Sequence, residues 1–357
     1  MAGLLNVLTA TQKPRVHPYI RQLLAKAEAL HGADSGAYRG IHNQYFRMPA
    51  QVPGAALSER HYDALGDLPA GLERLYRRVV VVDLLSACSS ECVFCIRGLY
   101  DPHTRSGSEL SAIVGYLAGD PHLREVLITG GDPLISPKKL GELVDAIAAE
   151  APGIQVIRIG TRLPVQQPAA FRENTYDIFR RHADRFSFDI AVQINHPFEL
   201  QPEAVDVLRN LSRCGVRVYS QNVLLKGVND DLETLTELYD QLRTLRVIPH
   251  YLFHAVPMVG TDEFRTSVAR GLDLARQLTA NGRISGLGKP MYALMTAVGK
   301  VVLYEDSILD DRDGLLTVRT EYRLDERQYW NPGYRLPDAA TVSARGTLDV
   351  RYVDGVG

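Results

Sequence analysis

The sequence predicts an α/β protein whose main part is an incomplete (β/α)6 barrel of the TIM type. Apolar, β-branched runs alternate with amphipathic stretches at intervals of roughly thirty residues, which indicates βαβ units and a parallel sheet. Polar motifs stand directly after the apolar runs, where the strands of a barrel carry their functional groups. This placement favours a partial barrel over an open doubly wound sheet.

Each expected element has its own local signal. Runs of β-branched residues predict strands, and Ser, Pro or Asp at the start of an amphipathic stretch predicts a helix. The intervening helices are expected in 136–151, 201–215 and 229–245. The six expected strands are 78–85, 125–131, 154–161, 186–194, 216–224 and 248–256.

Two extensions are expected to flank the barrel, which takes 76–306. Residues 1–75 predict a helical N-terminal extension, with short helices in "HPYIRQLLAKAEALHG" and "LSERHYDALGDL". Residues 307–357 read as an irregular, polar C-terminal tail that packs on the barrel or on a neighbouring subunit. A hairpin is expected there in "LLTVRTEYRLDERQYW".

Composition excludes several classes of protein. Forty basic and forty-two acidic side chains leave a formal charge of −2, without the basic excess that a nucleic-acid-binding protein usually carries. No run reaches the roughly eighteen apolar residues that span a bilayer, and the first residues do not resemble a secretory leader. We therefore expect a cytoplasmic protein that binds neither nucleic acid nor membrane.

Three of the four cysteines stand close together, in "LLSACSSECVFCIRGLY". Cys88, Cys92 and Cys95 have a C-x3-C-x2-C spacing, whereas Cys214 reads as a small apolar residue. A structural zinc site usually has four ligands, and no second pair of cysteines or matching histidines is present. Three thiolates on a four-iron cluster leave one iron open to a substrate or cofactor.

That spacing, placed after the first barrel strand, resembles the radical S-adenosylmethionine (SAM) superfamily. An aromatic residue, Phe94, stands just before the third cysteine, as an aromatic residue commonly does in members of that superfamily. "TGGDPL" (129–134) ends the next strand and resembles the superfamily's glycine-rich SAM segment, which assigns Gly130, Gly131 and Asp132 to SAM. Glycines let backbone carbonyls approach a ligand closely, and the carboxylate adds an acceptor.

A narrower resemblance covers roughly 75–305. "CIR", "LITGGDPL", "IRIGTRLPV", "INHP", "NVLLKGVND" and "FRTSV" are similar to segments of the lysine 2,3-aminomutase family, in the same order. Members combine a [4Fe–4S] cluster, SAM and pyridoxal 5′-phosphate. Through a 5′-deoxyadenosyl radical they move an amino group from the α to the β carbon of an amino acid. The resemblance implies this isomerase activity here.

The resemblance also implies residue roles. Lys289, after the glycines of "SGLGK", matches the lysine that forms the Schiff base with pyridoxal phosphate, while Lys300 reads as structural because it begins a strand. Gln221 and Arg78 are expected at the cofactor phosphate. Arg97 matches the arginine that holds the substrate carboxylate, a task that suits its planar fork of donors. Arg162, Gln193 and His196 are expected at the SAM end of the site.

Departures from the family pattern concern the substrate. The two aspartates that hold the distal ammonium of lysine are replaced by Val256 and, counted back from Lys289, by Gly282. A buried ammonium without a partner is costly, so an amino acid other than lysine is expected. His254 and Asn281 are expected to line its pocket together with these two residues.

Assembly and electron supply follow from the same comparison. The family carries further cysteines that bind zinc between subunits, but Asp231 occupies one such place and 307–357 contains no cysteine. A homodimer, if formed, would not be held by zinc. A flavodoxin- or ferredoxin-like protein is expected to donate the electron.

Three other functions remain open at this point. One is a different radical reaction on an amino acid bound to pyridoxal phosphate, such as epimerisation, desaturation or fragmentation. The second is a radical SAM enzyme without pyridoxal phosphate. The third is a non-catalytic protein that uses the cysteines for a structural metal.

Overall fold

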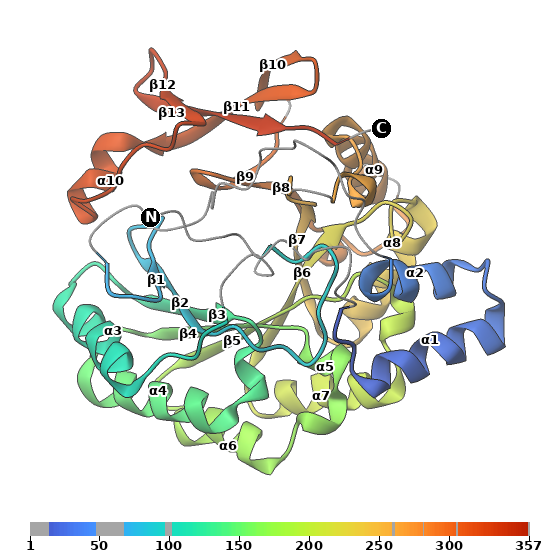
Figure 1. Cartoon of the computed structure of the whole chain (residues 1–357), viewed down its shortest axis with the longest axis horizontal. Helices are drawn as coiled ribbons and strands as arrows, with labels where there is room; N and C mark the ends of the chain where they lie inside the picture. Colours follow the sequence, from blue (N-terminus) through green and yellow to red (C-terminus); the bar gives the residue numbers. More distant parts are fainter. Residues whose placement is uncertain are drawn as a thin grey trace.

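A computed structural model of the chain describes residues 14–47, 68–96, 102–258, 261–280, 282–304 and 306–355. Its centre is a curled nine-stranded sheet that forms an open half-barrel, in the strand order β1 to β9 (Figure 1). Strands β2 to β8 are parallel, and β1 and β9 flank them in antiparallel pairing. The strands are β1 Leu72–Glu73, β2 Val79–Leu85, β3 Glu125–Gly130, β4 Val156–Thr161, β5 Ser187–Val192, β6 Arg217–Leu224, β7 Ile248–His254, β8 Met291–Thr296 and β9 Gly299–Val302.

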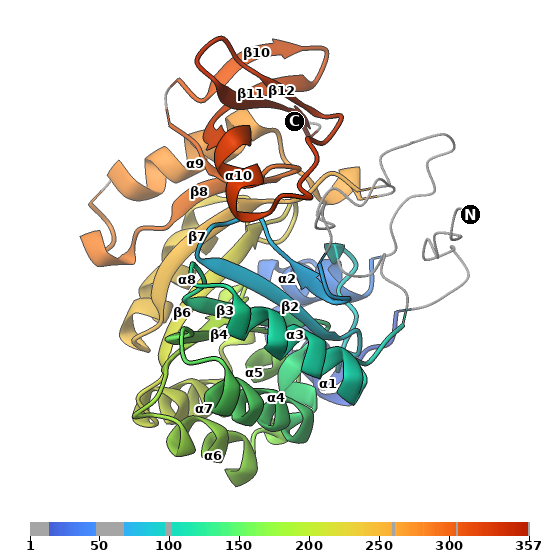
Figure 2. The ribbon, with the colours of Figure 1, turned by 90° about the vertical axis from the view of Figure 1, so that its left-hand side faces the viewer.

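Helices connect successive strands and cover the convex face of the sheet (Figure 2). Their starts carry expected signals: Ser106 and Glu109 form a capping box on α3, and the Asp231 side chain accepts from the Thr234 amide to cap α8. The connecting helices are α3 Gly107–Gly119, α4 Pro137–Glu150, α5 Leu163–Gln166, α6 Glu173–Arg181, α7 Pro202–Arg213, α8 Leu232–Thr244 and α9 Val268–Ala280.

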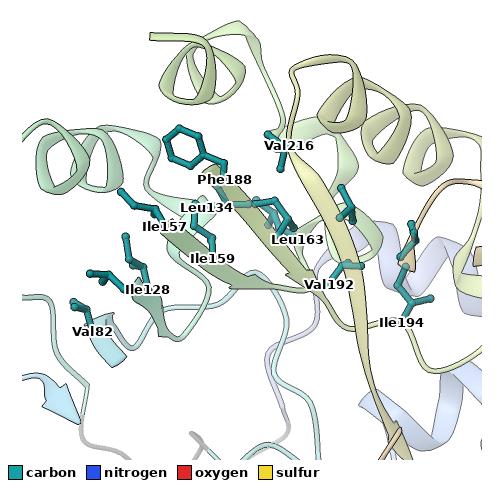
Figure 3. Packing of buried hydrophobic residues seen from close by; sticks show 14 of the residues in the cluster. Val82, Ile128, Leu134, Ile157, Ile159, Leu163, Phe188, Val192, Ile194 and Val216 are labelled. Atoms are coloured by element: carbon teal, nitrogen blue, oxygen red, sulfur yellow. The ribbon is translucent and has the colours of Figure 1, made fainter. Parts of the chain in front are cut away.

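The main apolar core lies between the sheet and these helices. Alternate residues of each strand, such as Val82, Ile128 and Ile159, point toward the helix layer, where Leu134 and Leu163 also pack (Figure 3). Because side chains alternate along a strand, the intervening residues face the hollow of the half-barrel. This second face, called the interior face below, is available for chemistry.

Both chain ends add to the half-barrel. The N-terminal helices α1 (Pro18–His31) and α2 (Gly36–Tyr45) pack together at the carboxyl ends of the strands. The C-terminal part forms a second, four-stranded antiparallel sheet in the order β10-β11-β13-β12. Its elements are β10 Ile308–Arg312, β11 Leu315–Arg323, α10 Leu324–Trp330, β12 Ala340–Val342 and β13 Thr347–Val353.

All six expected strands are present, which confirms the α/β class and the partial barrel. The structure adds a seventh parallel strand, β8, from "MYALMT", which the sequence reading left unassigned. The C-terminal tail is a folded sheet and not an irregular segment. The expected hairpin is also wrong, because 315–323 is a strand and 324–330 is a helix. Of the second N-terminal helix, only Leu68 falls within the described residues.

Within the described ranges, no helix combines the length and the apolar character needed to cross a bilayer.

Candidate functional site

The cysteine loop (86–96) leaves the carboxyl end of β2 and is held on both sides by backbone hydrogen bonds. Ser86 donates to the His103 carbonyl, Glu91 to the Arg15 carbonyl at 2.8 Å, and Val93 to the Gln44 carbonyl at 3.0 Å. The N-terminal helices therefore help to set the position of this loop.

The three thiols of this loop share one electrostatic environment. Burial raises the pKa of the Cys88 thiol, and Cys95, Asp132 and Cys92 add to this increase. Burial, opposed by Arg162, raises the pKa of Cys92 to about 11. These groups therefore lie close enough to repel one another as thiolates, and a bound metal centre would relieve that repulsion.

Within the described part of the chain, no three His, Cys, Asp or Glu side chains converge as they would around a single metal ion. A four-iron cluster has a different requirement, because each thiolate binds its own iron atom. Three neighbouring thiols on one partly exposed loop fit that donor set.

The glycine-rich segment after β3 supports the base of the cysteine loop. Gly130 has a φ of +117°, and a Cβ atom there would lie 2.3 Å from the Leu85 carbonyl oxygen. A Cβ atom on Gly131 would lie 2.2 Å from the Ala87 carbonyl oxygen. Both positions require glycine because the cysteine loop crosses directly over them.

Asp132 fixes the end of β4 to this segment. Its carboxylate accepts from the backbone amides of Leu134, Arg162 and Leu163 at 2.9–3.1 Å, and from the Thr161 hydroxyl at 2.8 and 2.9 Å. Burial raises the pKa of Asp132 against the effect of these donors. The carboxylate is thus already occupied by protein donors; contact with SAM stays a prediction.

Arg162 follows β4 and is buried beside the cysteine loop. One guanidinium nitrogen donates to Cys92 Sγ at 2.9 Å, and the other donates to Glu199 at 2.6 Å and to Gln44 at 2.8 Å. The sequence placed Arg162 at the SAM end of the site. The structure brings it to the expected edge of the half-barrel, but its hydrogen bonds go to a cysteine and to two side chains that the sequence analysis did not assign.

The interior face carries polar atoms that lack protein partners. On β6, Val218 and Leu224 belong to the helix-side core, so Tyr219 and Gln221 face the interior. The Tyr219 hydroxyl and the Gln221 side-chain nitrogen are buried without a hydrogen-bond partner, as is the Gln193 side-chain nitrogen after β5. Unpaired buried donors of this kind are costly unless a ligand satisfies them.

A bulge in β7 brings further groups to the interior face. The pairing with β6 shifts between Ser220 and Gln221, and the Tyr219 ring lies 5.2 Å from the His250 ring. Burial, with Lys300 and Arg158 nearby, lowers the pKa of His250 to about 4.

Lys300 on β9 occupies the interior as well. It pairs with Met295 across from β8, and its ammonium lies 5.7 Å and 5.6 Å from the ring centres of Tyr251 and Phe253. Burial, with a contribution from Arg158, lowers the pKa of Lys300 to about 8. An amine in such surroundings is the type that serves as a nucleophile near neutral pH.

Lys289 lies at the other end of the strands from the cysteine loop. It stands just before β8, whose parallel pairing with β7 places Lys289 at the amino ends of the strands, while the cysteine loop lies at the carboxyl ends. Its ammonium donates to the Thr279 carbonyl. The expected role of Lys289 stays a prediction, and Lys300, which the sequence analysis classed as structural, is a second candidate for the same role.

Arg78 and Gly282 also lie elsewhere. Arg78 is exposed in the turn before β2, again at the amino ends of the strands. Arg158, whose guanidinium lies 5.9 Å from the centre of the Tyr219 ring, is a second cation beside Lys300 on the interior face. Gly282 is exposed after α9, and its assignment depended on counting from Lys289.

His254 is turned away from the interior. One ring nitrogen hydrogen-bonds the Tyr352 hydroxyl on β13 and the other the Thr266 carbonyl, both at 2.8 Å, and the side chain is fully buried. Burial lowers the pKa of His254 to about 4. It therefore joins the barrel to the C-terminal sheet and does not line a substrate pocket.

The remaining predicted residues fall into two groups. His196 is buried, accepts from the Phe198 amide and packs against Gly40 of α2; Val256 follows the carboxyl end of β7. Their expected roles stay predictions. Arg97 and Asn281 lie outside the described residues.

Comparisons with known proteins agree with this arrangement. Residues 83–239 match the family model described as the Radical SAM superfamily. The chain is 36% identical to a putative L-lysine 2,3-aminomutase of Aquifex aeolicus over 66% of this chain and 63% of that protein. It is 31% identical to the L-lysine 2,3-aminomutase of Acetoanaerobium sticklandii, over 64% of this chain and 55% of that protein. It therefore spans less than two thirds of the length of either relative.

Two further similarities extend the comparison. A glutamate 2,3-aminomutase of Clostridioides difficile is 29% identical over 65% of this chain and 54% of that protein. Among solved structures, a radical SAM methyltransferase from Sphaerobacter thermophilus aligns with a TM-score of 0.47 and 22% identity, over 64% of this chain and 69% of that chain.

The residues that match the family model contain strands β3 to β6, the cysteine loop and the glycine-rich segment described above. These similarities support the lysine 2,3-aminomutase family of the radical SAM superfamily, the family whose motifs this sequence resembles.

Proposed function

We propose that the chain is a radical SAM, pyridoxal-phosphate-dependent 2,3-aminomutase that acts on an amino acid other than lysine. The observation that carries this proposal is the pairing of two sites on one half-barrel. Three neighbouring thiols lie at the carboxyl ends of the strands. A lysine with a lowered pKa lies on the interior face of the half-barrel, among aromatic rings and unpaired polar groups.

Cys88, Cys92 and Cys95 would hold the [4Fe–4S] cluster, leaving one iron for SAM. Bound there, the cluster and SAM supply an organic radical that can remove an unactivated hydrogen. The chain itself orders the cysteine loop through Gly130 and Gly131 on one side and through the carbonyls of Arg15 and Gln44 on the other.

Pyridoxal phosphate fits the interior better than any other described region. Lys300 offers the amine, Arg158 offers a cation, and the Gln221 and Tyr219 donors lack protein partners. Covalently bound to an amino group, this cofactor supplies a π system that can share unpaired spin during amino migration. The unpaired donors support the cofactor's presence, because the protein otherwise leaves them without hydrogen bonds.

The charges inside the half-barrel favour a substrate without a distal ammonium. The interior-facing carboxylates of β2, β3 and β5 already have arginine partners. Asp83 lies 3.6 Å from the Arg105 guanidinium, Asp189 pairs with Arg217 at 2.7 Å, and Glu125 pairs with Arg158. A lysine side chain would have to break one of these pairs to be neutralised, which is unfavourable in a buried site.

An anaerobic amino-acid screen tests this proposal. The chain is reconstituted with iron and sulfide, supplied with SAM, pyridoxal phosphate and dithionite, and assayed for 5′-deoxyadenosine with each amino acid in turn. We expect one class of amino acid other than lysine to stimulate SAM cleavage. Lysine as the best substrate would contradict the substrate assignment, and no cleavage with any amino acid would contradict the function. In the cell, a flavodoxin- or ferredoxin-like donor would replace dithionite.

A further inference from the structure

Arg162 has more polar contacts than a surface or packing role requires. Its guanidinium lies 5.2 Å from the centre of the Tyr45 ring and 5.6 Å from that of Phe94. Within that aromatic enclosure it donates to Cys92 Sγ at 2.9 Å. A buried cation directed at one of the three thiols is a feature that the proposed reaction alone does not explain.

The guanidinium is held in a single orientation. Its second terminal nitrogen donates to Glu199 at 2.6 Å and to Gln44 at 2.8 Å. Glu199 is fully buried and accepts from the amides of Asn195 and His196, so it cannot move toward solvent. With these partners fixed, the nitrogen nearest the cysteine loop points at Cys92 and at no competing acceptor that the structure describes.

Gln44 links this arrangement to the N-terminal helices. Its side-chain oxygen also accepts from Asn195 at 2.9 Å, and its backbone carbonyl accepts from the Val93 amide at 3.0 Å. Helix α2 thus holds Arg162 and the cysteine loop at the same time. The Gln166 side chain adds a weaker second contact to Cys92 Sγ, at 3.3 Å.

We propose that Arg162 is a positioning residue that fixes Cys92 as a cluster ligand and raises the reduction potential of the cluster, with Gln166 as a second donor. The inference rests on the cluster of the proposed function, but it does not depend on pyridoxal phosphate or on the substrate.

The physical reason is the charge that reduction adds. The cluster becomes more negative when it accepts an electron, and hydrogen bonds to its sulfur ligands stabilise the reduced form more than the oxidised form. Because Glu199 balances the charge of Arg162, the directed N–H···S bond carries most of this effect. The other two thiols have no such donor among the described residues, so the three ligands are unequal.

The test is the reduction potential of the reconstituted cluster without SAM, followed by electron paramagnetic resonance during titration with dithionite. The variant is Arg162→Gln with Glu199→Gln, because removing Arg162 alone would leave a buried carboxylate without its partner. We expect a more negative potential. The expected shift is about 59 mV toward more negative potential, which for one electron corresponds to a tenfold smaller equilibrium constant for reduction of the cluster.

Two matched variants separate this effect from a general loss of stability. Gln166→Leu removes only the weaker donor, so it should shift the potential in the same direction by a smaller amount, even if the double variant folds poorly. Arg74→Gln with Asp120→Asn removes another buried ion pair, one that contacts Tyr116 and Trp330, and it should leave the potential unchanged.

An unchanged potential in both the Arg162 and Gln166 variants would overturn the inference. If the Arg162 variant instead bound SAM more weakly at an unaltered potential, the sequence-based assignment of Arg162 to SAM would replace it. If the wild-type chain takes up no cluster, the proposed function is overturned as well. If the wild-type chain binds a cluster whose reduction potential does not depend on Arg162, only this inference is overturned.

Discussion

The ammonium of Lys300 lies 5.6 Å from the centre of the Phe253 ring, on the interior face of the half-barrel. Lys289, eleven positions earlier in the chain, donates to a backbone carbonyl at the opposite end of the strands. The two lysines are therefore a natural pair of test and control for cofactor attachment.

We predict that Lys300→Ala abolishes covalent attachment of pyridoxal phosphate and reduces turnover at least about a hundredfold, since the internal nucleophile is lost. Lys289→Ala should retain both. Borohydride reduction followed by peptide mass mapping identifies the modified lysine. Label on Lys289, or unchanged labelling in the Lys300 variant, would show that the interior assignment is wrong.

The attachment reaction should depend on pH with a midpoint near the lowered pKa of Lys300, about 8. Only the neutral amine attacks an aldehyde, so the rate should rise as pH increases through that value. The measurement is the rate of the absorbance change after mixing the chain with pyridoxal phosphate between pH 6 and 10. A rate still rising steeply near the ordinary lysine pKa of about 10.4 would contradict burial of this amine.

Gly131→Ala should disturb the cysteine loop, because the new methyl group would meet the Ala87 carbonyl oxygen at 2.2 Å. Overpacking of this kind costs about 1–3 kcal/mol of unfolding free energy, and the iron content after reconstitution should fall. Gly115→Ala on α3 is the matched control, since a Cβ atom there meets nothing within 4 Å. Equal iron content in the two variants would disprove the role of Gly131.

His254 makes stability depend on pH. Burial lowers its pKa to about 4 in the folded state, so between pH 6.5 and 4 the unfolded chain binds a proton that the folded chain does not. Stability should therefore fall as pH decreases through that window, by up to about 3 kcal/mol. Urea unfolding at a series of pH values measures this.

The His254→Gln variant should show a smaller loss of stability over the same pH window, because its side chain does not titrate. If the variant and the wild type lost equal stability between pH 6.5 and 4, His254 would not be the group responsible.

The sequence was sufficient for features encoded by local patterns. The six predicted strands, and the positions of the cysteine loop and the glycine-rich segment at the ends of strands, depend on residues close together in the chain, and each was found where expected. Sequence could not show the buried, aromatic surroundings of Lys300, because they depend on which way β9 pairs and on rings from β7.

Long-range contacts explain the other differences. His254 was expected to line the substrate pocket, but its ring hydrogen-bonds the hydroxyl of Tyr352, which is 98 residues away in the chain. Likewise, Gln44 meets Arg162 across 118 positions. Helix-capping residues and hydrophobic periodicity describe short segments of the chain, so they do not predict contacts between side chains about a hundred positions apart.

Amino migration can be followed directly through the nitrogen atom that moves. An amino acid that stimulates SAM cleavage is supplied with ¹³C at its α carbon and ¹⁵N in its α-amino group, and the product is examined by nuclear magnetic resonance and mass spectrometry. We predict an isomer of unchanged mass in which ¹⁵N is bonded to the β carbon and the labelled α carbon has become a methylene. A product in which ¹⁵N remains on the labelled carbon, or one of altered mass, would contradict the aminomutase assignment.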